Sequence, residues 1–186
     1  IVRMWLFPGH KPLFFDVQKK SNTNEYLVIK ESEAHLQYIE RMLQIALEEG
    51  VKLNLTLFNG VDAHLDLDQE YLKSFWNDLL NNKNSLLEAF LSGPLEKVLN
   101  LINSKKEYRE VVPQLDIANE INAYLTFFGR NGIGFKNGYE DANKFICKIY
   151  KKIKKHPVGK TLQVTASLGY GRESIDLYYN KLPWPS

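Results

Sequence analysis

Hydrophobic and polar residues alternate in several short stretches of the chain, and each stretch predicts a β-strand. Successive side chains of a strand point to opposite faces, so alternation is typical of a strand with one apolar and one polar side. The predicted strands lie at 1–7, 51–58, 111–122 and 162–168, and a short last strand is expected at 175–179.

Between these strands, apolar residues recur three and four positions apart, which predicts amphipathic helices. The predicted helices are 31–49, 71–80, 86–102 and 139–155. Gly93 and Pro94 must break or restart the third of them, because proline cannot continue a helix. A long polar loop is expected between the first strand and the first helix. Alternation of strands and helices in this order favours parallel strands joined by right-handed crossovers.

Two α/β architectures fit this order, an open doubly wound parallel sheet and a (β/α)8 barrel. The strands of a doubly wound sheet are near-continuous apolar runs. Here one face of three predicted strands carries polar residues, namely Asn54, Thr56, Gln114, Asp116, Thr165 and Ser167. This pattern favours a barrel with a polar interior, and the open doubly wound sheet remains the alternative.

The length of the chain limits how much of a barrel it can form. A whole barrel takes about 250 residues, whereas this chain has 186 and only four or five predicted strands. We therefore expect residues 1–186 to form a single domain that is an incomplete segment of a larger (β/α)8 barrel, covering about strands two to six.

Composition excludes several classes of function. The formal net charge is +2, from 24 basic and 22 acidic residues, so the chain lacks the basic footprint of a nucleic-acid binder. The dense basic run at 148–155 is best explained as the solvated face of an amphipathic helix. No stretch approaches the roughly 18 apolar residues of a membrane span. Cys147 is the only cysteine, which excludes an internal disulfide and a cysteine-based zinc site.

The third predicted strand is unusual because it carries an acid in its middle and another at its end. Alternation places Asp116 and Glu120 on one face, with Gln114 and Ala118, and places Asn119 on the other face. Buried charge is costly unless it is paired, so a strand of this kind more often ends in a site than in plain packing. The alternative is a half-buried edge strand whose polar face is solvated.

The end of this strand, Ile117-Ala118-Asn119-Glu120, resembles the end of the fourth strand in retaining (β/α)8-barrel glycoside hydrolases of the endoglucanase and β-mannanase group. Neighbouring segments agree in order and approximate spacing. Residues 2–7 resemble the second strand of that group, which carries an arginine, and 51–59 are similar to its third strand. Residues 162–169 then correspond to the fifth strand.

The resemblance implies hydrolysis of a β-linked poly- or oligosaccharide by a retaining mechanism with two carboxyl groups. It implies that Glu120 is the acid/base and that Asn119 donates a hydrogen bond to the sugar 2-hydroxyl. Arg3 is expected to orient the catalytic nucleophile. No cofactor and no metal are implied, the partner is the carbohydrate substrate, and a secreted or extracytoplasmic location follows from the resemblance only.

Further substrate contacts are expected from residues near the other strand ends. Trp5, Phe58 or Tyr170 would offer an apolar face to a sugar ring. Asn59 lies at the end of the predicted strand 51–58, which resembles the third strand of the group. The group commonly carries a histidine or paired asparagines there, and Asn59 is expected to contact the substrate.

The chain also departs from the pattern of the group. Residues 176–182 lack the histidine that is usual in the sixth strand, and the sequence does not reach the seventh strand, where the nucleophile is expected. The nucleophile must therefore lie outside this chain. Two other functions stay open, a non-catalytic carbohydrate-binding barrel and an α/β domain that only binds a partner.

Overall fold

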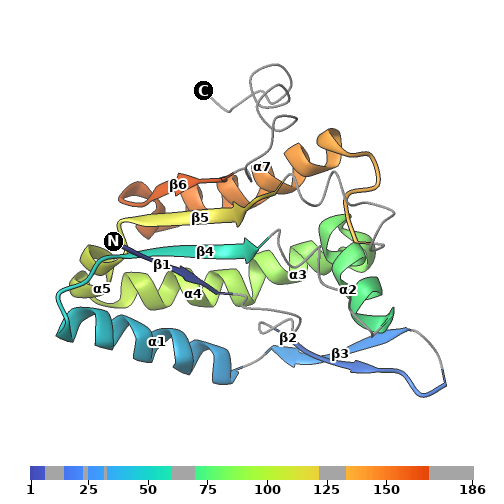
Figure 1. The fold of residues 1–186 in the computed structure, drawn as a ribbon, viewed down its shortest axis with the longest axis horizontal. Helices are drawn as coiled ribbons and strands as arrows, with labels where there is room; N and C mark the ends of the chain where they lie inside the picture. Colours follow the sequence, from blue (N-terminus) through green and yellow to red (C-terminus); the bar gives the residue numbers. More distant parts are fainter. Residues whose placement is uncertain (7–14, 23–24, 32, 60–69, 122–132, 168–186) are drawn as a thin grey trace.

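Four parallel strands form the central sheet of the computed structural model (Figure 1). The structure describes residues 1–6, 15–22, 25–31, 33–59, 70–121 and 133–167. The strands are β1 (Val2–Trp5), β4 (Leu53–Asn59), β5 (Gln114–Asn119) and β6 (Gln163–Thr165), and they pair in the order β1-β4-β5-β6. The order of these four strands across the sheet is therefore the same as their order along the chain. A doubly wound sheet reverses its strand order at a switch point, so this progressive order is that of a barrel segment.

Helices cover the apolar face of the sheet, as expected from right-handed crossovers. They are α1 (Glu33–Glu48), α2 (Glu70–Leu80), α3 (Leu86–Ser92), α4 (Pro94–Ser104), α5 (Lys106–Val111) and α7 (Tyr139–Lys155), with two 3₁₀ turns, η2 (Lys83–Ser85) and η3 (Pro157–Lys160). In Figure 1, α1, α4 and α7 run alongside the strands. Leu55, Leu57, Leu115 and Ile117 point toward this layer and are at most 1% exposed. Their burial makes this face the core.

The predicted helices are confirmed, and local sequence explains their ends. Pro94 is the first residue of α4, where its missing N–H costs no hydrogen bond, and the predicted break at Gly93 separates α3 from α4. In α7, Ile149 and Ile153 are fully buried, while Lys148, Lys151 and Lys155 are exposed. The basic run is therefore the solvated face of this helix. No helix within the described ranges is long and apolar enough to cross a membrane.

The prediction of a long polar loop after the first strand is wrong, because this segment contains an antiparallel hairpin. Its strands are β2 (Phe15–Lys19) and β3 (Tyr26–Glu31). Phe15 and Tyr26 contact the ring of Phe75 on α2 edge-on, with ring centroids 6.1 and 5.4 Å apart. The apolar alternation in each strand is too short to stand out from the polar residues around the turn, and the strands are stabilised by docking on α2.

The strand predicted at 111–122 is shorter than expected. It begins at Gln114, because Val111 is the last residue of α5, a helix that the pattern did not predict. Val111 and Val112 suggested a strand because they are β-branched, but both are buried at the end of this helix. Pro113 then disfavours helical geometry in the residue before it, which ends α5. The strand predicted at 175–179 lies outside the described residues.

Candidate functional site

The guanidinium group of Arg3, on β1, joins polar side chains from β4, from β5 and from the segment that follows β6. Its Nε donates to Thr56 Oγ1 at 3.2 Å and its Nη1 donates to Asn119 Oδ1 at 2.9 Å. Its Nη2 donates to Ser167 Oγ at 2.8 Å and forms an ion pair with Asp116 Oδ2. One cation therefore holds four side chains in fixed positions on the polar face of the sheet.

Asp116 is completely buried, and its charge is compensated by several donors. Besides Arg3, the hydroxyl of Ser167 donates to Oδ2 at 2.7 Å and the hydroxyl of Thr165 donates to Oδ1 at 3.3 Å. A buried carboxylate is tolerated only with such partners. The acid in the middle of this strand thus has the partners that the sequence pattern demanded, and the half-buried edge strand with a solvated face is excluded.

Strand register explains why these side chains meet. Thr56 pairs with Trp5, Asp116 with Thr56, and Thr165 with Asp116, so these residues lie at one level across the sheet. Residues at one level of parallel strands point to the same face. Arg3 lies one level lower, opposite Asn54, and its long side chain reaches up to this level.

Glu120 follows directly after β5 and has an unusual backbone conformation. Its φ is +53°, in the left-handed region that non-glycine residues rarely adopt. The flanking backbone is fixed, because Ser167 N donates to Ala118 O at 2.8 Å and Ile121 N donates to Ser167 O at 3.2 Å. Left-handed geometry costs an L-residue roughly 1–2 kcal/mol. The structure thus holds a partly exposed glutamate at the strand end in a strained turn.

Arg3 and Asn119, two of the predicted site residues, come together at this edge of the sheet. Arg3 contacts Asn119 directly, and Trp5, two residues along the same strand, is 40% exposed. The prediction that Asn119 lies on the face opposite Asp116 is wrong, because both accept hydrogen bonds from Arg3. Asn119 is the last residue of β5, and the left-handed turn at Glu120 ends the strict alternation there.

The other predicted substrate contacts have different outcomes. Phe58 is 1% exposed and packs against Trp76, Phe90 and Phe145, so it offers no face to a sugar, and this prediction is wrong. The backbone of Asn59 pairs with that of Asn119, but its side chain lies outside the described part of the structure. Tyr170 also lies outside the described residues.

The sequence did not assign Asp116, Thr165 and Ser167 to the site, although it placed them on the polar face. The alternation in neighbouring strands indicated that these three side chains share a face. The sequence did not indicate that Arg3 would contact Asp116 and Ser167. Among the described residues, no three His, Cys, Asp or Glu side chains lie close enough together to hold a metal ion.

Comparisons with solved structures identify the fold. A beta-1,4-D-mannanase from Cryptopygus antarcticus matches with a TM-score of 0.60 and 18% identity, over 89% of this chain and 44% of that chain. The beta-1,4-mannanase of the sea hare Aplysia kurodai matches with a TM-score of 0.53 and 16% identity, over 81% and 44% of the two chains. The endo-1,4-beta-mannanase of Rhizomucor miehei matches with a TM-score of 0.52 and 22% identity, over 87% and 46%.

This chain spans less than half the length of each of these three proteins. No protein-family model matches the sequence, and no curated protein matches it. The fold is therefore α/β and corresponds to part of a (β/α)8 barrel, and the resemblance to the β-mannanase group is confirmed at the level of the fold.

Proposed function

We propose that this chain supplies one half of the catalytic site of a retaining glycoside hydrolase that acts on a β-linked poly- or oligosaccharide. The observation that carries the proposal is that Asn119, which accepts a hydrogen bond from Arg3, is followed directly by Glu120 in a strained turn at the end of β5. Active sites of (β/α)8 enzymes lie at the carboxyl ends of the barrel strands. The fold of the mannanase structures supports the same assignment.

In this proposal Glu120 is the general acid and then the general base. It protonates the glycosidic oxygen as the bond to the leaving sugar breaks, and a second carboxylate attacks the anomeric carbon. The resulting glycosyl–enzyme ester is cleaved by water, from which Glu120 removes the proton. Retention requires the two carboxyl groups to be about 5–5.5 Å apart. The second carboxylate belongs to a part of the protein outside this chain.

Asn119 and Arg3 position the reacting groups. Arg3 Nη1 fixes the rotation of the Asn119 amide through its Oδ1 atom, and the amide Nδ2 donates to the sugar 2-hydroxyl. Asp116 acts through Arg3, because its buried charge holds the guanidinium in place. Arg3 remains 35% exposed, and in this proposal its exposed side orients the nucleophile. Trp5, which is 40% exposed on the same strand as Arg3, stacks on a sugar ring in this proposal.

The test is Glu120→Gln in the full-length protein, with a β-1,4-linked manno- or gluco-oligosaccharide as substrate. We expect kcat to fall by roughly 10²–10⁴-fold with the fold intact by circular dichroism, because the amide cannot transfer the proton. Azide should restore turnover of an aryl β-glycoside, since an anionic nucleophile needs no general base. Glu110→Gln, on the exposed surface of α5, is the control and should leave kcat unchanged.

Two results would overturn the proposal. Unchanged turnover by Glu120→Gln would remove Glu120 from the mechanism. If the full-length protein binds these oligosaccharides but hydrolyses none of them, the chain belongs to a carbohydrate-binding barrel without catalysis.

A further inference from the structure

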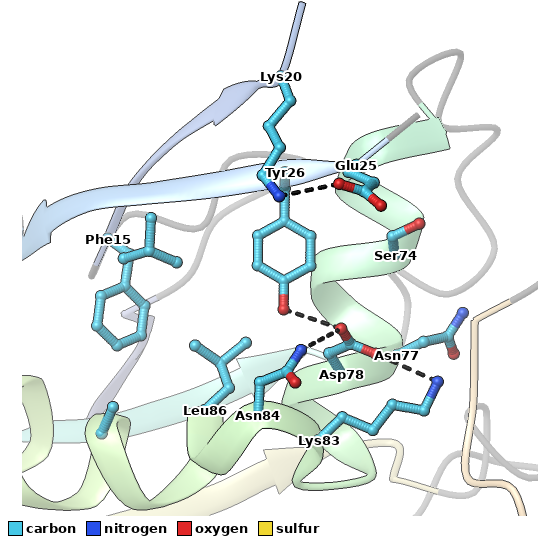
Figure 2. Close-up of a pocket in the computed structure, with 12 residues that line it drawn as sticks. Phe15, Lys20, Glu25, Tyr26, Ser74, Asn77, Asp78, Lys83, Asn84 and Leu86 are labelled. Carbon is cyan, nitrogen blue, oxygen red and sulfur yellow. Dashed lines mark hydrogen bonds and ion pairs between the residues drawn. The ribbon is translucent and has the colours of Figure 1, made fainter. Parts of the chain in front are cut away.

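A pocket lies between the β2–β3 hairpin and the helices α2 and α3 (Figure 2), and none of the side chains that Arg3 joins lines it. Its volume is about 680 Å³, within the range of roughly 300–1,000 Å³ that is usual for small-molecule sites. Phe15, Val28 and Leu86 give it an apolar wall. The proposed catalytic function does not use this pocket.

Asp78 on α2 is the polar centre of the pocket. Its side chain is 15% exposed, and Figure 2 shows three other side chains directed at its carboxylate. The hydroxyl of Tyr26 donates to Oδ2 at 2.9 Å, while Asn84 Nδ2 donates to Oδ2 at 3.4 Å and Lys83 Nζ lies 3.4 Å from Oδ1. The two long contacts are weak. A ligand hydroxyl can replace them at little cost.

The surrounding structure holds these groups in position before any ligand binds. The ring of Tyr26 packs edge-on against Phe75 with centroids 5.4 Å apart. Burial and the nearby Asp78 carboxylate raise the pKa of Tyr26 to about 12, and the protonated hydroxyl donates to Asp78. Asn84 lies in the turn between α2 and α3 with φ +52°, a left-handed geometry that asparagine tolerates better than most residues.

The charges around the pocket favour a neutral ligand. Two lysines and two carboxylates line it, Lys20 with Glu25 and Lys83 with Asp78, and their formal charges cancel. Lys20 Nζ and Glu25 Oε2 are 2.9 Å apart. An anion or a cation would meet groups of both signs. A diol instead donates to a carboxylate and accepts from an ammonium or amide group, and its carbon skeleton can lie on the apolar wall.

We propose that this pocket binds a neutral polyhydroxylated ligand, a sugar of one or two rings, with Asp78 accepting hydrogen bonds from adjacent hydroxyls. Asn84 and Lys83 donate to the same hydroxyl oxygens. The apolar wall covers the less polar face of the ring. Binding here is independent of Glu120, which belongs to a different part of the fold.

Methyl NMR of the full-length protein tests this, because Val28, Leu86 and Ala89 place methyl-bearing side chains in the pocket wall. The probes are mannobiose and cellobiose, with chromatography after each titration to verify that the sugar is uncleaved. We expect saturable shifts of these methyl signals at millimolar sugar. Asp78→Asn should weaken binding roughly tenfold or more, because hydrogen bonds to a charged acceptor are the strong ones. Tyr26→Phe should weaken binding to a smaller degree.

Asp141→Asn is the matched control. Asp141 is also mostly buried, with 18% of its side chain exposed, and also lies near a lysine, with Lys144 Nζ at 3.8 Å. This variant and Glu120→Gln should give the same shifts of the methyl signals of the pocket as the parent does. Asn84→Ala, an exposed position, keeps the test valid if Asp78→Asn fails to fold. The proposal is overturned if neither sugar shifts these signals, if glucuronate or ethylammonium shifts them instead, or if Asp78→Asn and Asn84→Ala both bind normally.

Discussion

Replacing Arg3 with glutamine tests the central claim about the polar face, that one cation compensates the buried Asp116. The substitution keeps a polar side chain but removes the positive charge. Asp116 is 0% exposed and would retain the hydroxyl donors Ser167 and Thr165, so its carboxylate would be buried without a cation.

The expected cost follows from this geometry. Removing one partner of a fully buried ion pair costs about 3–5 kcal/mol. Arg3 is 35% exposed and two hydroxyls remain on Asp116, so we expect the free energy of unfolding to fall by about 2–3 kcal/mol. Arg41→Gln is the control. Arg41 and Glu48 are 3.6 Å apart and each 61% exposed, and such surface pairs contribute roughly 0–1 kcal/mol.

Urea unfolding of the full-length protein, followed by tryptophan fluorescence, measures the free energy of unfolding of Arg3→Gln and of Arg41→Gln. An m-value equal to that of the parent shows that the same transition is compared. The double variant Arg3→Gln/Asp116→Asn provides a second readout. Because it leaves no uncompensated charge, it should be more stable than Arg3→Gln alone. Equal costs for Arg3→Gln and Arg41→Gln, or a double variant whose loss is the sum of the single losses, would refute the reasoning.

Two further predictions concern other parts of the fold. Gly159→Ala should lower the free energy of unfolding by about 3 kcal/mol, because an added Cβ would lie 1.9 Å from the backbone oxygen of Ile153. Gly50→Ala is the control: Gly50 has φ +64° and open space around it, so this substitution should cost about 1 kcal/mol. Equal melting temperatures of the two variants would contradict this prediction. Burial lowers the pKa of His35 from 6.5 to about 4. Between these two pH values the unfolded chain binds more protons at His35 than the folded chain does, so the free energy of unfolding should fall by about 1–3 kcal/mol as the pH drops from 6.5 to about 4. The same urea series on His35→Gln should show a shallower loss, and an identical pH dependence would exclude His35 as its source.

The sequence predicted the fold well where long periodic segments were involved. The parallel strands and their crossover helices were evident because each buries a regular face. The β2–β3 hairpin was missed because Phe15 and Tyr26 depend on Phe75, a contact between residues far apart in the chain. The helix α5 was missed because β-branched Val111 and Val112 favour a strand locally, while burial of Tyr108 and Val111 stabilises a helix.

The candidate site was predictable in its residue types but not in its connections. A period of two placed Asp116 on a polar face, and the sequence required a partner for it without identifying that partner. Arg3, 113 residues earlier, becomes the partner only through the register of β1, β4 and β5. Asn119 was assigned to the wrong face because alternation does not describe the turn that ends a strand. Phe58 looked like an exposed aromatic ring, but its ring lies in the aromatic cluster of the core.

The backbone at Glu120 also bears on how this protein responds to selection. A glutamate at φ +53° makes the native state less stable than glycine or asparagine would at the same position. Directed evolution for heat resistance alone would therefore favour loss of the very carboxylate on which the proposed chemistry depends. A screen for hardier variants of this protein should score turnover and melting temperature together, because at this position the two properties are opposed.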